Sequence, residues 1–181
     1  YYANCERFDE TCGQLLDYLD RKGLRENTLV ALVVDNGWIQ ETGPRRTRGN
    51  FAPKSKLSPY DGGLRTPVVL RWPGKVKPGT YNDLVSTIDV APTLLHAAGV
   101  APPAAMSGEN LLRPATGKGP LRRQAVFGDL YVHTAVSLDR PSLNLTHRWV
   151  RRGDWKLIHP RDPAARPELY NVREDPFEER N

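Results

Sequence analysis

The chain has 181 residues, of which 26 are Lys or Arg and 21 are Asp or Glu, so its formal net charge is +5. A length of roughly 100–200 residues suits one domain with at most a small appendage. No run of about 18 apolar residues occurs, so we expect no membrane span. The basic excess is small and no RNA- or DNA-binding motif accompanies it, so we expect no nucleic-acid partner.

The N-terminal third predicts a helix followed by a buried strand. Apolar residues recur at helical spacing over residues 3–22, and Gly23 suits the end of that helix. The sequence shows neither an initial Met nor a signal-like segment, which we interpret as a fragment or a processed piece. The run Thr28–Val34 is apolar and β-branched without alternation, which is typical of a strand buried on both faces.

The middle of the chain predicts a long loop, two more strands and a helix. Residues 38–63 have no periodicity, and loops of that length in compact domains are usually functional or disordered. Strands are expected at Thr66–Trp72 and Leu84–Ile88. Asp89 suits the N-cap of a helix that ends at Gly99.

The last third of the chain predicts a boundary segment followed by short strands. Residues 101–120 are rich in Pro, Gly and Ala, which favours a boundary between a domain at 1–110 and a subdomain at 120–181. Gly153-Asp154 is a hairpin signal between two strand candidates. Short strands are expected at Ala125–Tyr131, Arg148–Arg151, Trp155–His159 and Leu169–Val172. We therefore expect an α/β layer with a small antiparallel four-stranded sheet appended.

Asp35 and Asn36 are candidate metal ligands, because they directly follow the Thr28–Val34 strand. In open α/β sheets, ligands bind at the carboxyl ends of the strands. Carboxylate and amide oxygens are hard donors that suit Ca²⁺ or Mg²⁺, although two ligands do not complete a site. The alternative is that Asp-Asn-Gly is simply a tight turn.

Basic residues on the loop are candidate anion contacts. Lys54 and Lys56 precede Tyr60 by six and four residues, and a lysine there could bind an anionic oxygen as a point charge. Arg45, Arg46 and Arg48 form a basic cluster that could attract an extended polyanion such as a sulfated glycan. In each case the alternative is a solvated surface residue.

The order of the motifs, more than any single one, resembles the C-terminal half of a type I sulfatase of the alkaline-phosphatase-like superfamily. The stretch Tyr60–Gly74, with a lysine four residues before it, is the most specific part of this resemblance. The shared segments are Phe8–Gly13, Asn27–Val30, Val34–Gly37, Lys56, Tyr60–Pro67, Arg71–Gly74, Ile88–Leu95, Trp155–Ile158, Glu168–Asn171 and Asp175-Pro176. The implied fold is part of an alkaline-phosphatase-like α/β/α sandwich with a small C-terminal antiparallel subdomain.

The resemblance implies hydrolysis of sulfate esters by a formylglycine nucleophile and a Ca²⁺ ion, with Mg²⁺ as a possible substitute. By the same resemblance, Asp35 and Asn36 are the second pair of metal ligands, and Lys56 is the catalytic, sulfate-binding lysine in preference to Lys54. The implied substrate is a sulfated small molecule or glycan. The implied compartment is the periplasm, the exterior or the lysosome.

The chain departs from the family pattern because two motifs of the active site are missing from it. Neither Cys5 nor Cys12 lies in the Cys/Ser-x-Pro-x-Arg motif that yields formylglycine, and the first pair of metal-binding aspartates is absent. We therefore expect an inactive fragment whose missing N-terminal half is a partner of this chain. The alternatives are a phosphate or phosphonate ester hydrolase of the superfamily, a non-catalytic basic glycan-binding remnant, and a structural half that works only when joined to its partner.

Overall fold

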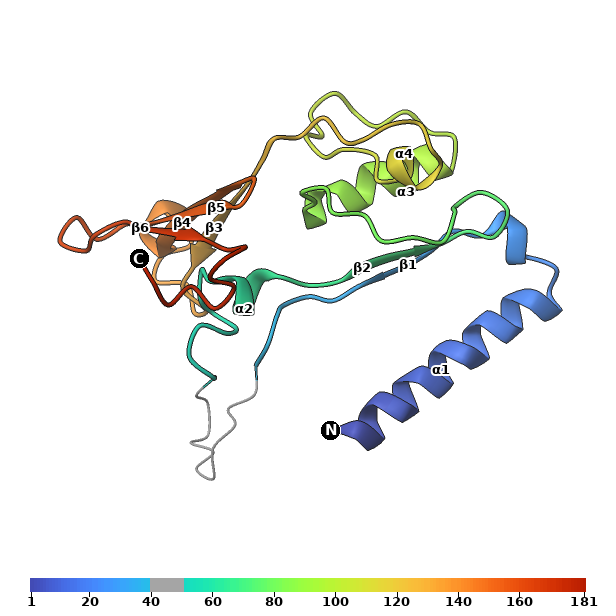
Figure 1. Cartoon of the computed structure of the whole chain (residues 1–181), viewed down its shortest axis with the longest axis horizontal. Coiled ribbons are helices and arrows are strands. Elements are labelled where there is room, and N and C mark those ends of the chain that lie inside the picture. The colour runs from blue at the N-terminus through green and yellow to red at the C-terminus, as the bar shows by residue number, and fades with distance from the viewer. Residues whose placement is uncertain (40–50) are drawn as a thin grey trace. The chain divides into compact units, whose positions relative to one another are not determined.

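The computed structural model describes residues 1–39 and 51–181 (Figure 1). Its internal contacts divide the chain into two compact units, each built from separate stretches of sequence. Unit 1 comprises Tyr1–Leu32, Val68–Asp83 and Thr87–Leu121, and unit 2 comprises Val33–Pro67, Leu84–Ser86 and Arg122–Asn181. The domain boundary expected between residues 110 and 120 stays a prediction.

Unit 1 begins with the predicted helix, α1, at Tyr2–Arg21. Gly23 follows with a φ of +67°, a left-handed conformation that suits glycine at the end of a helix. A short 3₁₀ turn, η1, spans Arg25–Asn27. In the part of the chain that the structure describes, no residue of α1 is buried, so its apolar face is left uncovered.

Two of the predicted strands pair in a short sheet. They are β1 at Val30–Val33 and β2 at Val68–Arg71. Trp72 directly follows β2 and is buried, and its indole N–H donates a 2.8 Å hydrogen bond to the carbonyl of Glu26. This bond ties the end of β2 to the turn that precedes β1.

The strand expected at Leu84–Ile88 is wrong. The chain there is irregular and then forms a 3₁₀ turn, η2, at Thr87–Asp89. Asp89 is fully buried, and its Oδ1 accepts a 2.8 Å hydrogen bond from the backbone N–H of Glu109. A strand needs a neighbour to complete its hydrogen bonds, and no strand among the described residues pairs with this segment. Helix α3, at Val90–Ala97, starts directly after Asp89, as predicted.

The remaining helix of unit 1, α4, spans Leu112–Ala115. It lies in the region that the composition marked as a boundary. Thr93 of α3 is buried, and its Oγ1 accepts a 2.9 Å hydrogen bond from the backbone N–H of Leu111. The segment that enters α4 is therefore anchored to α3 by a buried polar contact.

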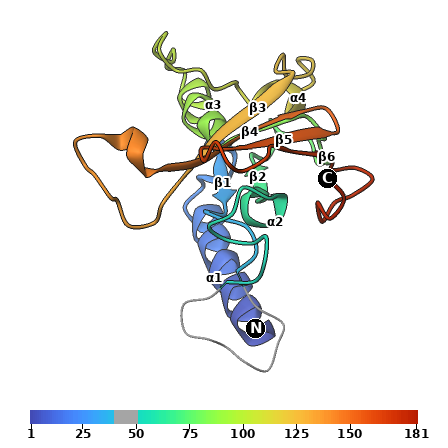
Figure 2. The same cartoon turned by 90° about the vertical axis from the view of Figure 1, so that its left-hand side faces the viewer.

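Unit 2 contains the predicted four-stranded antiparallel sheet, in the order β3-β4-β5-β6 (Figure 2). The strands are β3 at Ala125–Tyr131, β4 at Leu145–Arg152, β5 at Trp155–Pro160 and β6 at Glu168–Asn171. A 3₁₀ turn, η3, at Pro141–Asn144 precedes β4. Gly153 has a φ of +57° in the two-residue turn between β4 and β5, which confirms the hairpin.

The core of unit 2 lies on one face of this sheet. Ile158, Tyr170 and Val172 are buried together, and Tyr60 and Trp149 pack against them. Tyr60 directly precedes a single-turn helix, α2, at Asp61–Leu64, and the C-terminal segment of the chain runs beside it (Figures 1 and 2). The long loop is thus fixed to the sheet at its Tyr60 end.

No helix among the described residues has the length and apolar character that a membrane crossing requires.

Candidate functional site

Three backbone segments of unit 2 meet where β1 ends. The backbone N–H of Gly37 donates a 2.8 Å hydrogen bond to the carbonyl of Gly63, and that of Trp38 donates a 2.6 Å bond to the carbonyl of Gly62. The N–H of Lys56 donates a 2.8 Å bond to the carbonyl of Trp38. The segment after β1, the lysine-bearing loop and α2 therefore form one hydrogen-bonded cluster.

The glycines of this cluster are required by how closely the backbones approach. A Cβ atom on Gly37 would lie 2.9 Å from the carbonyl carbon of Gly62 and closer still to its oxygen. A Cβ atom on Gly63 would lie 2.7 Å from the carbonyl carbon of Ser55. Because such contacts are shorter than van der Waals separation, no residue with a side chain fits either position without a backbone shift. The Asn-Gly and Gly-Gly motifs thus have a packing origin.

The metal-ligand candidates directly precede Gly37 of this cluster in the sequence. Asp35 is exposed, and among the described residues no group hydrogen-bonds or pairs with its carboxylate. Asn36 is half-buried, and its Nδ2 donates a 2.9 Å hydrogen bond to the carbonyl of Gly37. This bond fixes the amide and leaves its Oδ1 as an acceptor.

These two donors fit part of a calcium site. An exposed carboxylate and an oriented amide oxygen are hard ligands of the kind that Ca²⁺ takes, although Ca²⁺ takes about 6–8 oxygens in all. Within residues 1–39 and 51–181, no group of three or more His, Cys, Asp or Glu side chains could hold a metal ion. The described residues can therefore supply a pair of ligands.

Lys56 lies at a sharp bend of the loop. Lys54 and Leu57, on either side of it, are non-glycine residues with φ values of 55° and 68°. Left-handed backbone is costly for such residues, and it persists only where the surroundings enforce it. The Lys56 side chain is half-buried, with its ammonium 5.7 Å from the centroid of the Phe51 ring. No described residue accepts a hydrogen bond from this ammonium, so within the described part of the chain it is available to an anion.

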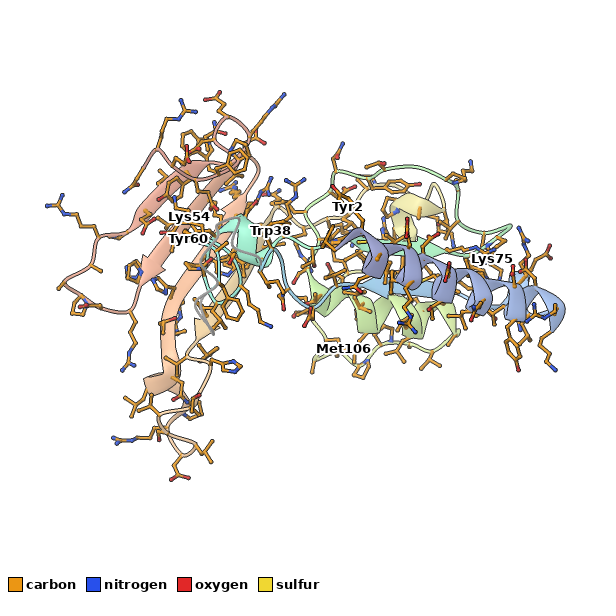
Figure 3. The ribbon with its side chains drawn as sticks, turned by 90° about the horizontal axis from the view of Figure 1, so that it is seen from below. Tyr2, Trp38, Lys54, Tyr60, Lys75 and Met106 are labelled. Atoms are coloured by element: carbon orange, nitrogen blue, oxygen red, sulfur yellow. The ribbon has the colours of Figure 1, made fainter. Side chains whose placement is uncertain are left out.

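Lys54 is held by other groups. Its ammonium donates a hydrogen bond to the carbonyl of Glu178 and lies 4.7 Å and 5.5 Å from the ring centroids of Tyr60 and Tyr170. Figure 3 shows Lys54 next to Tyr60. A cation between two aromatic faces, with a carbonyl acceptor, is stabilised where it lies. This geometry favours a structural role for Lys54 over a role in binding substrate.

A buried ionic network joins α2 to the sheet and to the C-terminal segment. The Lys156 ammonium, fully buried on β5, lies 2.8 Å from Oδ1 of Asp61 and 2.9 Å from Oε1 of Glu178. Arg151 lies 3.3 Å from the other Asp61 oxygen. The backbone N–H of Asp61 donates a 2.6 Å bond to Oε2 of Glu178. Two carboxylates thus share a buried ammonium.

Two tyrosines share one carboxylate beside this network. The Tyr60 hydroxyl donates a 2.8 Å hydrogen bond to Oε2 of Glu168, and the Tyr170 hydroxyl donates to the same oxygen. Burial, and then the bond to Glu168, raise the pKa of Tyr60 to about 12. The same two causes raise the pKa of Tyr170. Both hydroxyls therefore remain protonated donors over the ordinary pH range.

Lys156 and Glu178 were not predicted from the sequence. One signal could have found Lys156: alternation along β5 places it on the same face as the buried Ile158. A lysine at an inward position needs an anionic partner, because a buried unpaired charge is costly. The anion-binding candidates Arg45, Arg46 and Arg48 lie outside the described residues.

The chain is similar to sulfatases along its whole length. The profile of the family described as "N-sulphoglucosamine sulphohydrolase, C-terminal" matches residues 50–181. The N-acetylglucosamine-6-O-sulfatase of Bacteroides thetaiotaomicron is 31% identical over 187 residues, which covers 100% of this chain and 31% of that protein. Human arylsulfatase A is 36% identical over 123 residues, which covers 66% of this chain and 24% of that protein.

Solved structures confirm the fold class. A protein solved in complex with its substrate D-glucosamine-2-N,6-O-disulfate has a TM-score of 0.71 and 29% identity, covering 96% of this chain and 33% of that one. A phosphonate monoester hydrolase from Silicibacter pomeroyi has a TM-score of 0.70 and 26% identity, covering 93% of this chain and 35% of that one. The predicted alkaline-phosphatase-like α/β class is therefore confirmed.

The chain spans about a third of the length of the curated relatives that match nearly all of it, 31% of one and 36% of another. The family profile covers most of the chain, and the N-acetylglucosamine-6-O-sulfatase, which matches all of this chain, agrees with it. This chain therefore belongs to the sulfatase family, and its residues 50–181 match the C-terminal region of that family.

Proposed function

We propose that this chain supplies part of the active site of an enzyme that hydrolyses sulfate esters. In this proposal Asp35 and Asn36 are ligands of Ca²⁺, and Lys56 binds the sulfate group. The observation that carries it is the hydrogen bond from the Lys56 N–H to the Trp38 carbonyl, which ties the lysine loop to the segment that bears the two ligands. The family membership supports the same assignment, as does the exposed Asp35 carboxylate, with which no described residue forms a hydrogen bond or ion pair.

Each residue has a chemical task in this reaction. A bound Ca²⁺ ion would supply positive charge that offsets the charge developing on the sulfate oxygens. The carboxylate of Asp35 and the amide oxygen of Asn36 would hold the ion, with further ligands from outside the described residues. The Lys56 ammonium would bind a non-bridging sulfate oxygen as a fixed cation, which stabilises the transition state where solvent is excluded.

The nucleophile comes from elsewhere in this proposal. In this family it is a formylglycine made from a Cys/Ser-x-Pro-x-Arg motif, and the 181 residues contain no such motif. We therefore expect residues 1–181 alone to show no turnover of an aryl sulfate. Turnover by those residues alone would contradict this part of the proposal.

The proposed substrate is a sulfated carbohydrate. Two relatives favour this class: one is named an N-acetylglucosamine-6-O-sulfatase, and another is solved with D-glucosamine-2-N,6-O-disulfate as its substrate. The expected compartment, which is the periplasm, the exterior or the lysosome, stays a prediction.

The test uses the intact gene product that carries this chain, assayed with an aryl sulfate and with 6-O-sulfated N-acetylglucosamine. Removing a group that stabilises developing charge typically costs about 10²–10³-fold in rate, so we expect losses of that order for Lys56→Met and Asp35→Asn. Calcium chelation should abolish the activity, and added Ca²⁺ should restore it. Lys118→Met and Asp139→Asn, at exposed positions, are the matched controls. Full activity of either site variant would refute its assigned role.

A second candidate is a phosphonate ester hydrolase, which the solved enzyme from Silicibacter pomeroyi favours. Both reactions develop charge on non-bridging oxygens, so the same residues would serve either. Comparison of kcat/KM for matched aryl sulfate and aryl phosphonate esters decides between them.

A further inference from the structure

Glu178 contacts the loop that carries Lys56 through its backbone carbonyl and through one of its carboxylate oxygens. Its side chain is 1% exposed. Its backbone carbonyl accepts a hydrogen bond from the Lys54 ammonium, and its Oε2 accepts a 2.6 Å bond from the backbone N–H of Asp61. Its remaining oxygen, Oε1, lies 2.9 Å from the Lys156 ammonium. One residue of the C-terminal segment therefore contacts the loop at two points and the sheet at a third.

These contacts lie on both sides of Lys56 in the sequence. Lys54 precedes it by two residues and Asp61 follows it by five. Lys54 itself and Leu57, which lies between the two contacts, are left-handed, so the conformation of this stretch needs external contacts to persist. Glu178 supplies such a contact at each end.

Lys156 fixes Glu178 in turn. Its ammonium is fully buried and bridges Glu178 and Asp61, at 2.9 Å and 2.8 Å. Each charge in the trio is costly to bury alone and is stabilised by its partner, so the geometry is narrowly defined. The ion pair thereby joins Glu178 to β5.

We propose that Glu178, held by Lys156, is a positioning residue that sets the place of the Lys56 ammonium in the active site. This inference rests on the proposed role of Lys56 in binding sulfate. Glu178 acts on the substrate only through the loop, so its effect disappears when Lys56 has no charge to position.

The experiment is a double-mutant cycle in the intact gene product, with Glu178→Gln and Lys56→Met measured singly and together. A glutamine cannot offer acceptors to both the Lys156 ammonium and the Asp61 N–H, so it releases one contact. Because small misplacements of a catalytic group cost up to about 10²-fold, we expect Glu178→Gln to lower kcat/KM about tenfold. In the Lys56→Met background it should lower kcat/KM no further. Glu179→Gln, at the exposed neighbouring position, is the matched control.

A purely structural role gives a different result. It lowers the amount of active enzyme equally in both backgrounds, so the two losses multiply, and that outcome overturns the inference while the role of Lys56 stands. Full activity of Lys56→Met alone refutes the proposed function and the inference together. If Glu178→Gln does not fold, Lys54→Met takes its place in the cycle, since it removes the bond to the Glu178 carbonyl and leaves the buried trio intact. Multiplying losses in that cycle overturn the inference as well.

Discussion

The backbone N–H of Lys56 donates a 2.8 Å hydrogen bond to the carbonyl oxygen of Trp38, two residues beyond Asn36. The loop that bears the lysine is thus joined to the segment that bears the metal-ligand candidates through main-chain atoms. A main-chain contact survives changes of side chain, which makes Lys56→Met a clean test of charge. Changes that displace these backbone segments should, by contrast, weaken metal binding and sulfate binding together.

Gly37→Ala is expected to destabilise unit 2, because the added Cβ would lie 2.9 Å from the Gly62 carbonyl carbon and closer to its oxygen. Forcing an extra methyl group into a packed site costs about 1–3 kcal/mol, and here the opposing atoms are backbone, which cannot rotate away. We expect a lower free energy of unfolding in urea and weaker Ca²⁺ binding by the intact gene product.

Gly13→Ala is the control for that change. Gly13 lies within α1, and a Cβ atom added to it would have nothing within 4 Å, so alanine there should stabilise by about 0.5–1 kcal/mol. Equal stability of Gly37→Ala and the unsubstituted protein would show that the two backbones separate more easily than their packing implies.

Lys54→Met and Lys56→Met are expected to differ in their effect on stability. Lys54 loses a hydrogen bond to the Glu178 carbonyl and its contacts with two aromatic rings, so its replacement should lower the free energy of unfolding by about 1–3 kcal/mol. Lys56 has no hydrogen bond from its ammonium to any described residue, so its replacement should leave stability nearly unchanged and remove activity. Thermal unfolding and sulfatase assays on both variants check this, and matching stability losses would contradict it.

Local patterns were sufficient to predict most elements of the fold. Helix α1, the β4–β5 hairpin and the four strands of unit 2 follow from periodicity and from turn residues such as Gly153. The strand expected at Leu84–Ile88 failed because its outcome depends on a tertiary contact. The buried Asp89 accepts a hydrogen bond from Glu109, twenty residues away, and no sequence pattern reveals that pairing.

In the candidate site, too, local features of the sequence were predictable and contacts between distant residues were not. Its residue types and spacing singled out Asp35, Asn36 and Lys56, whose assigned roles stay predictions. Contacts far apart in sequence were not predictable: Lys156 and Glu178 meet Asp61 from 95 and 117 residues away. The only local signal was the alternation along β5, which places Lys156 on the inward face of the strand. The partners of a buried charge are set by the fold rather than by neighbouring residues.

Stability should fall at alkaline pH because of Tyr60, which is half-buried, and Tyr170, which is buried. The pKa of Tyr60 is raised from 10.0 to about 12, and that of Tyr170 is also raised. Above pH 10 the unfolded chain loses phenolic protons that the folded chain retains, so the free energy of unfolding falls as the pH rises from 10 toward 12. Urea unfolding across this range measures the slope. The double variant Tyr60→Phe/Tyr170→Phe should show a shallower slope, and an unchanged slope would assign the effect to other groups.

Lys156→Met should destabilise the protein more than any of the preceding substitutions. It leaves the buried carboxylates of Asp61 and Glu178 without the ammonium that lies 2.8 Å and 2.9 Å from them. Breaking a buried ion pair by removing one partner costs about 3–5 kcal/mol. The matched control is Arg173→Met, which breaks a 3.5 Å pair with Asp154 whose side chains are 79% and 48% exposed.

Exposed pairs contribute at most about 1 kcal/mol, and salt screens them, so the Arg173 variant should unfold close to the unsubstituted protein. Removing the Glu178 charge as well should recover part of the loss in Lys156→Met, because one fewer carboxylate is then buried without a cation. Urea unfolding of Lys156→Met and of the double variant Lys156→Met/Glu178→Gln measures that recovery. If the double variant is less stable than Lys156→Met, the attraction between Lys156 and Glu178 is not what holds the C-terminal segment, and its hydrogen bonds to Lys54 and Asp61 must do so instead.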